Sequence, residues 1–312
     1  MKINTLAKNA VVALTTVLAV VSFGSSARAG FVNLGAAGDF AALALTHGID
    51  SSGPLGPNGQ YTFNGNVGVA SSGPIPPAPS QKFQASGSVS MPPSAKLYLY
   101  SGDTFNSSAP GIPQPQPQNA ANDAFLTQAR NDAFAASSFA AGLTPTATYG
   151  TINNNLTITE AAAGNYVFNI SSINFSGGKA LTLNAPAGST YTLNISDSIV
   201  LTSGSILVSG GLTASDVLIN YTGTNVVQFS GGGNSSQVYG TILAPLAEVG
   251  LHPGFVAGSV IADRITLSSG GQIGGMTVVP EMNALFPLFG LAIAVGSTHL
   301  LRRRASRKSM SA

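Results

Sequence analysis

The feature that most limits the fold is a hydrophobic period of two that runs from Leu156 to Thr277. Apolar side chains alternate there with Thr, Asn or Ser in short segments such as LTIT, YVFNIS, INFS, ALTLN, YTLNIS and VLINYT, and Gly, Ser or Ala-Pro corners separate the segments. This alternation is typical of half-buried strands. We therefore predict a mainly β fold in which Leu156, Ile158, Leu181, Leu183, Leu193 and Ile195 point inward.

The same segments also repeat. GTILAPLAEVGL, which begins at Gly240, aligns with GSVIADRITL, which begins at Gly258, at an offset of 18 residues. A repeat of about this length with small residues at its corners favours a β-solenoid over a β-sandwich, which stays as the alternative. The prediction is a β-solenoid over residues 143–278.

Residues 30–118 have a different composition. They are rich in Gly, Pro and Ser and contain short alternating stretches such as YTFNGNVGVA and KLYLY. They end in PGIPQPQPQ, residues 110–118, which is extended because proline lacks an N–H and disfavours helix in the residue before it. We predict short strands and loops, followed by a stiff connector.

Residues 119–142 predict the one α-helix of the body. Asn119 or Asn122 can cap its N-terminus, Asp123 suits the first turn and Gly142 suits the end. Helical spacing puts apolar residues on one face, widened by two more phenylalanines: Phe125, Leu126, Ala129, Ala133 and Ala136, with Phe134 and Phe139. We expect this helix to lie along the solenoid with Phe125 and Ala133 facing it.

Residues 1–29 match an export signal. Lys2 and Lys8 precede an uncharged apolar stretch, residues 10–23, and Ala27-Arg28-Ala29 supplies small residues at the positions that a signal peptidase reads. We predict cleavage before Gly30. A buried N-terminal helix is the alternative, and it explains neither the lysines nor the small residues.

Residues 279–312 combine a short acidic motif, an apolar run and a basic end. The run, residues 284–301, has 18 residues, and at about 1.5 Å per residue it is just long enough to cross a thin bilayer. Arg302, Arg303 and Arg304 follow, and basic flanks mark the cytoplasmic side. The sequence therefore predicts a transmembrane helix in the inner membrane with the body outside; a helix buried in the core is the alternative.

This tail resembles the PEP-CTERM sorting signal of Gram-negative bacteria, in which a Pro-Glu motif precedes a membrane helix and an arginine cluster. Val279, Pro280 and Glu281 match the motif, and Met282 stands where a second proline is usual, which leaves the identity of the sorting enzyme open. The resemblance implies an exosortase-type sorting protease as partner. We expect an exported protein that is tethered to the membrane and then reaches the cell surface or the extracellular space.

Composition excludes several functional classes. Between Gly30 and Pro280 ten acidic side chains face five basic ones, so that part carries a net charge of −5 and lacks the basic surface that nucleic acid requires. The chain has no cysteine, which excludes disulfides, zinc–thiolate sites and thiol nucleophiles.

Motifs for catalysis are also missing from the sequence. His47 and His252 lie in Gly-flanked segments that we interpret as turns, and Asp263-Arg264 is interpreted as a solvated ion pair at a corner. No G-x-S-x-G elbow, D-x-D calcium loop or phosphate loop is present. We therefore predict no catalytic residue, no metal site and no cofactor, and a protein that is not an enzyme.

The strands offer polar positions that point outward instead. The candidate binding face consists of Thr157, Thr159, Thr182, Asn184, Thr192 and Asn194. These side chains can simply solvate the strands, or they can form an uncharged face that orders water or sugar hydroxyls. The face has no strict T-x-T repeat, which argues against ice.

Four Gly-rich strings resemble the ice-binding-like family and the related choice-of-anchor A surface domains: LGAAGDFAALAL from Leu34, NGNVGV from Asn64, YGTILAP from Tyr239 and FVAGSVIADRITLSSGGQI from Phe255. The resemblance implies a right-handed β-helix with an α-helix packed alongside. From these observations we expect a non-enzymatic cell-surface or extracellular-matrix protein that acts in adhesion or matrix structure. An ice-binding protein and a polysaccharide-active enzyme are the alternatives.

Overall fold

The computed structural model describes residues 28–29, 31–51, 53, 60–70, 83–231 and 236–274. Its strands up to the helix are β1 Arg28–Ala29, β2 Val32–Asn33, β3 Phe40–Ser51, β4 Tyr61–Phe63, β5 Asn66–Val69, β6 Phe83–Ala85, β7 Val89–Ser90, β8 Leu97–Leu99 and β9 Phe105–Ser107. After helix α1, Ala120–Ala141, come β10 Ala147–Ile152, β11 Leu156–Thr159, β12 Asn165–Ser176, β13 Ala180–Ala185, β14 Thr190–Thr202, β15 Ser205–Gly210, β16 Val217–Tyr221, β17 Val227–Ser230, β18 Gln237–Val238, β19 Thr241–His252, β20 Phe255–Val256, β21 Val260–Leu267 and β22 Gln272–Ile273. Short 3-10 helices cover Gly35–Asp39 and Ala214–Asp216.

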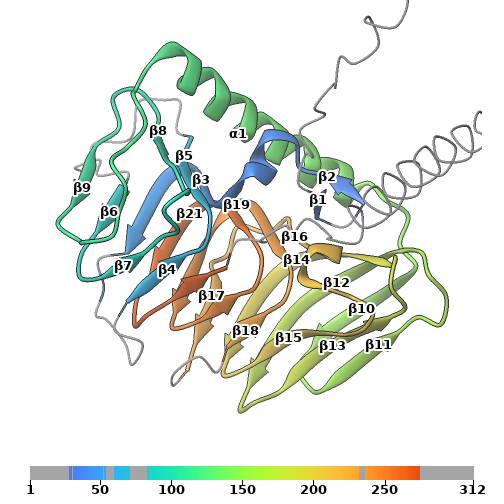
Figure 1. Ribbon diagram of the computed structural model, residues 1–312. Coiled ribbons are helices and arrows are strands. Elements are labelled where there is room, and N and C mark those ends of the chain that lie inside the picture. The colour runs from blue at the N-terminus through green and yellow to red at the C-terminus, as the bar shows by residue number, and fades with distance from the viewer. Residues whose placement is uncertain are drawn as a thin grey trace, which may run out of the picture.

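The strands wind into a β-solenoid with three sides (Figure 1). Long strands bend across two sides: the first half of β14 pairs with β16 and its second half with β17. The helix side holds β10, β16, β5, β8 and the first halves of β12, β14, β19, β21 and β3; the second side holds β17, β6, β9 and the second halves of the long strands. The third side is the sheet β11-β13-β15-β18-β20-β22-β4-β7. Every pairing except β1 with β2 is parallel, so the predicted solenoid is confirmed and the sandwich is excluded.

The sequence repeat corresponds to stacked turns of the solenoid. In β19 and β21, Ile242 pairs with Val260 and Ala244 with Ala262, which is the offset of 18 residues expected from the sequence. A bulge then shifts the register, so that Glu248 pairs with Arg264. The predicted inward residues are also confirmed, because all six pack in or against one core that runs through the solenoid.

The N-terminal region is part of the same solenoid. β3 pairs with β21, with Val260 opposite Ala42 and Ile261 opposite Leu43, and β5 and β8 continue the sheet beyond β3. On the third side β4 likewise follows β22. The solenoid therefore includes strands from residues 30–118 as well as from residues 143–278, and its first and last long strands meet in the middle.

Helix α1 runs back along the solenoid from the β8 end toward the β10 end (Figure 1). Its 22 residues are about 33 Å long at 1.5 Å per residue, and the nine strands of the helix side span about 38 Å at 4.8 Å between neighbours. The Asn119 side chain accepts from the N–H of Asn122, as a capping residue should. The helix thus ends slightly short of β10.

The packing of α1 explains its small residues. Alanines at the interface let the helix approach the sheet closely, and the buried residues are Leu126, Ala129, Ala133, Ala136, Ser137 and Ala140. Phe125 is half-buried and packs on Phe40 and Tyr98, with ring centroids 5.5 and 5.3 Å away. The expected contact by Phe125 and Ala133 is therefore confirmed. The expectation for Phe139 was wrong: its side chain is 55% exposed, because it lies beyond the stripe that touches the sheet.

The two ends of the solenoid differ. At the β8 end the proline-rich connector lies against the last turn, where Gln116 N–H donates to the Leu97 carbonyl, and Leu97 forms a parallel bridge with Pro115. At the other end β10 and β11 are the outermost described strands of their sheets. Proline cannot donate to a further strand, so the connector ends the ladder on its side.

Most of both chain ends falls outside the described residues. This includes the signal segment up to residue 27, the sorting motif, the apolar run 284–301 and the arginines. Arg28 and Ala29, the last two residues of the predicted signal, form β1 against β2. Within the described part of the chain, no helix has the length and hydropathy needed to cross a membrane.

Replacing Phe125 tests the docking of α1. Phe125→Asp puts a charge between Phe40 and Tyr98, where no basic partner is described, and we expect it to lower the free energy of unfolding by about 2–4 kcal/mol. Phe139→Asp is the matched control on the exposed side of the same helix and should change stability by less than about 0.5 kcal/mol. Urea unfolding of both variants measures the difference; equal losses would mean that α1 is not docked in this way.

Candidate functional site

Four of the six candidate face residues come together on the third side. Thr157 and Thr159 of β11 pair with Thr182 and Asn184 of β13, and their side chains are exposed or half-exposed. Asn184 Nδ2 lies 3.5 Å from Thr159 Oγ1 and donates toward it. On the next strand, β15, Leu207 pairs with Thr182 and Ser209 pairs with Asn184. The row that contains Thr182 therefore stops being polar after two strands, whereas the row that contains Asn184 continues to a third, so the polar ladder is two to three strands deep.

Thr192 and Asn194 do not join this ladder. Both belong to β14 on the helix side, where Thr192 is fully buried and its hydroxyl has no described hydrogen-bond partner. Asn194 donates from Nδ2 to the Ala140 carbonyl of α1 at 2.8 Å. Alternation correctly predicted that these side chains leave the core, but it carries no information on which side of the solenoid the helix covers.

Asparagines from three neighbouring strands form a ladder beneath the end of α1. Asn220 Nδ2 donates to Asn194 Oδ1 at 2.9 Å, and Asn194 Nδ2 lies 3.3 Å from Asn169 Oδ1. Asn220 also donates to the Ser137 carbonyl and accepts from the Ser137 hydroxyl. The ladder thus donates to two carbonyls near the end of α1, those of Ser137 and Ala140, and ties this end of the helix to the sheet.

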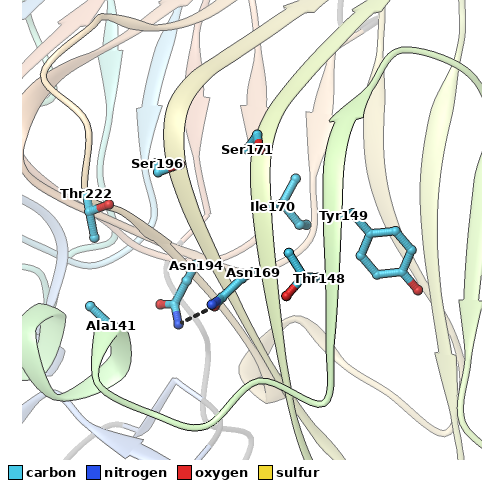
Figure 2. Close-up of a pocket in the computed structure, with 9 residues that line it drawn as sticks. All are labelled: Ala141, Thr148, Tyr149, Asn169, Ile170, Ser171, Asn194, Ser196 and Thr222. Atoms are coloured by element: carbon cyan, nitrogen blue, oxygen red, sulfur yellow. Dashed lines mark hydrogen bonds between the residues drawn. The ribbon is translucent and has the colours of Figure 1, made fainter.

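Beyond the end of α1 the ladder borders an open hollow of about 280 Å³ (Figure 2). The strands β10, β12 and β14, the last residue of α1 and the residue after β16 line it: Ala141, Thr148, Tyr149, Asn169, Ile170, Ser171, Asn194, Ser196 and Thr222. The hollow exists because α1 stops before β10 and leaves the outward side chains of the first two strands uncovered. Of these residues, the alternation predicts Asn194 and Ser196 to point outward, and the candidate binding face includes Asn194 alone.

The hollow is uncharged, and its lining combines polar side chains with Ala141, Tyr149 and Ile170. Its lining contains hydroxyl groups, each of which can donate and accept hydrogen bonds, and side-chain amides, which donate through nitrogen and accept through oxygen. Asn169 accepts from Asn194 through Oδ1, and within the described part of the chain its Nδ2 donates no hydrogen bond. No carboxylate, imidazole or amine lines the hollow, and Tyr149 is the one ionisable side chain among its lining residues.

His252 lies in a hydrogen-bonded chain on the second side rather than in a turn. It is the last residue of β19, and its Nδ1 lies 2.6 Å from Ser268 Oγ. Thr266 Oγ1 donates to Glu248 Oε1 at 2.7 Å and lies 3.2 Å from His252 Nε2. Since the Thr266 hydrogen points to Glu248, Nε2 carries the proton and Nδ1 accepts from Ser268. The turn expected from the flanking glycines was wrong.

His47 was also placed wrongly, because it lies in β3. Its Nδ1 is 2.7 Å from Asp263 Oδ2, which links the first long strand to the last one. Asp263 therefore pairs with His47, and the ion pair expected between Asp263 and Arg264 is not found. The described residues also contain no group of three His, Cys, Asp or Glu side chains that could hold a metal ion.

Comparison with known proteins gives one family and a set of similar folds. The family described as "Putative Ice-binding-like adhesive domain" matches residues 33–274. An ice-binding protein from an Arctic yeast aligns over 80% of this chain and 96% of its own, at 17% identity and a TM-score of 0.50. An ice-binding protein from an Antarctic biological consortium aligns over 77% and 89%, also at 17% identity and 0.50. These likenesses show the fold alone, and no curated protein matches the chain.

His252 gives the fold a testable pH dependence. Burial lowers the pKa of His252 below its ordinary value of 6.5, and the nearby Glu248 carboxylate opposes part of that change. Below about pH 6.5 the unfolded chain binds a proton at His252 that the folded chain does not, so this contribution to stability is present above pH 6.5 and is lost as the pH falls. We expect the melting temperature to fall more steeply from pH 7.5 to 5 in the parent than in His252→Gln. Parallel curves would contradict the lowered pKa of this half-buried ring.

Proposed function

Because the chain belongs to the ice-binding-like adhesive domain family, we propose that it is an exported, non-enzymatic surface adhesin that holds a neutral polysaccharide in the hollow beyond the end of α1. The observation that carries this proposal is the lining of the hollow, which combines amides and hydroxyls and has no charged side chain. A sugar presents hydroxyls that both donate and accept, and such a lining can pair with each of them.

The size and position of the hollow support the same ligand class. A volume of about 280 Å³ at the surface accommodates one or two sugar units of a longer chain rather than an enclosed small molecule. The lining side chains come from strands and from a docked helix, which hold them in place before a ligand arrives. An adhesive contact benefits from such preorganisation, because less conformational entropy is lost on binding.

Ice binding is the second candidate, and the ladder of Thr157, Thr159, Thr182 and Asn184 on the third side favours it. This ladder is two to three strands deep, about 10 Å at 4.8 Å per spacing. On the second side the outward positions include Glu248, Arg264 and His252, which interrupt any uncharged row. We therefore expect no thermal hysteresis and no inhibition of ice recrystallisation.

A polysaccharide-active enzyme is the third candidate. Glycoside hydrolysis requires two carboxylic acids placed across the scissile bond, and the hollow contains neither Asp nor Glu. We expect a screen with neutral and acidic glycans to give no cleavage product.

The proposal includes export and sorting. Residues 1–29 direct export, and the Val279-Pro280-Glu281 motif, the apolar run 284–301 and Arg302 to Arg304 form the sorting signal. The helix holds the body outside the inner membrane until an exosortase-type protease cuts near Glu281. Surface or matrix location agrees with an adhesive domain, since its ligand is outside the cell.

Blocking the hollow tests the ligand site. Ser196→Trp places a large side chain at an exposed position of the lining, and we expect at least tenfold weaker retention on immobilised dextran, mannan or laminarin. Thr157→Trp is the matched control at an exposed position of the third side and should bind like the parent. If only the Thr157 variant loses retention, the binding face lies on the third side. If the parent and both variants all fail to bind any of these glycans, the polysaccharide proposal is refuted.

Processing of the tail is tested separately. Intact-mass analysis of the surface fraction from the native host should find a form that ends near Glu281, while the membrane fraction retains the full-length form. Glu281→Ala should abolish the shorter form, because the residue belongs to the matched motif. If only protein ending at Ala312 is found, the helix is a permanent anchor; if Glu281→Ala is released normally, the sorting assignment is wrong.

A further inference from the structure

Among the described residues, the β10 end of the solenoid is an open sheet edge. β10 and β11 follow each other along one turn, and each is the last described strand of its sheet (Figure 1). Residues 147–159 read ATYGTINNNLTIT and contain no Lys, Arg, Asp, Glu or Pro, which are the residues that usually protect an edge. Lys179 donates to the Asn153 carbonyl, but this contact lies at the corner between the two strands.

Backbone donors point out of this end at regular intervals. Thr146 N–H donates to the Val167 carbonyl of β12, and N–H directions alternate along a strand. The N–H groups of Ala147, Tyr149 and Thr151 therefore point away from β12, toward the open end. Around them, half-buried apolar side chains cover the end of the core incompletely: Ala147, Tyr149, Leu156 and Tyr166.

The opposite end is covered on two of its three sides. There the connector lies on the last turn, with Val89 N–H donating to the Pro110 carbonyl and Gln116 N–H to the Leu97 carbonyl. Four prolines, at positions 110, 113, 115 and 117, supply no donors to a further strand. The connector thus blocks a further strand beyond β7 and β8, whereas β9 is the outermost described strand of the second side. Among the described residues, an end that is uncovered on all three sides is found only at β10.

We propose that this open end pairs with the same end of a second copy, so that the protein forms a closed two-fold dimer. A single added strand would hydrogen-bond to the edge of one side only, for example β10. It would leave the β11 edge and the exposed end of the core uncovered. A second copy, turned by a two-fold axis through the helix side, places β10 against β10, sets the third side of each copy against the second side of the other, and brings the two exposed core ends together. Rotation by a two-fold axis reverses the direction in which the partner winds, so the facing strands run antiparallel, and the interface closes on itself. The uncharged sequence of this turn lets two identical edges meet without repulsion.

The dimer has a consequence for the hollow. Thr148 and Tyr149 of β10 belong both to the open edge and to the lining of the hollow (Figure 2). Pairing of two β10 ends therefore brings two hollows close together on either side of the interface. The dimer itself is inferred from the edge alone and does not depend on the ligand, but with the proposed function it would make adhesion bivalent.

Charge at Thr148 tests the pairing. Thr148 is exposed and its side chain points outward next to the edge, so Thr148→Lys or Thr148→Glu should leave the fold and the melting temperature unchanged. Sedimentation of the full chain in detergent should give twice the protomer mass for the parent. Each charged variant alone should dimerise at least tenfold more weakly, because like charges meet across the axis, and an equimolar mixture of the two should restore the dimer.

The absence of cysteine allows a second, independent measurement. Thr148→Cys should give a covalent dimer with a short bis-maleimide, while Asn106→Cys on β9 at the capped end, also exposed, should not. A monomeric parent would overturn the proposal, as would a dimer that both charged variants retain or one that cross-links through Asn106→Cys. If the parent protein is a monomer that still binds glycans, the dimer proposal is wrong and the proposed function stands. If it is a dimer that binds no glycan, the proposed function is wrong and the dimer proposal stands.

Discussion

The structure depends on the pairing of β21 with β3. Through it, the last long strand of the chain hydrogen-bonds to the first, with Val260 opposite Ala42 and Ile261 opposite Leu43, and the His47–Asp263 contact joins the same two strands. The turns formed by the N-terminal region thereby extend the turns formed by the C-terminal region. Since these contacts join residues more than 200 positions apart, we expect the solenoid to form slowly and only when both regions have been synthesised.

This pairing also determines the course of α1. The N-terminal turns end at β8 and the next turn to be built, β10, lies at the far end of the stack, so the chain must cross the whole length of the solenoid between them. The helix is the segment that crosses, and it covers one side in doing so. The residue types along one outward row of the helix side change with the position of α1. The row begins with Thr148, Asn169, Asn194 and Asn220 and continues with Leu243, Ile261 and Leu43. Apolar side chains lie under the body of the helix, whereas amides lie where its last carbonyls need donors.

The candidate site follows from the length of α1. A helix one or two turns longer would cover Thr148 and Asn169, and the hollow would not exist. The same shortfall leaves the β10 edge accessible, so the hollow and the open end share residues of one strand. Amides that anchor the helix thus also border the surface that we propose to bind polysaccharide, and rigidity of the site is a consequence of how the helix ends.

Much of the fold was predictable from the sequence because it rests on local patterns. Period-two alternation predicted the inward residues, the offset between Gly240 and Gly258 predicted stacked turns, and Asn119 with the alanine stripe predicted the docked helix. Local patterns also failed in specific places: His252 looked like a turn residue because glycines flank it, and Phe139 looked like part of the stripe because of its hydrophobicity.

What the sequence by itself determined is therefore the class of fold, the polar–apolar alternation and the uncharged character of the six candidate face residues. The tertiary structure decided which of those positions can meet a ligand. Thr182 and Asn194 occur in similar alternating strands, yet the first is half-exposed and the second is buried, because α1 packs on Asn194 through the Ala140 carbonyl. Alternation reports only whether a side chain leaves the core, since it depends on the strand alone; what lies above that side chain depends on a helix more than 50 residues away in the chain.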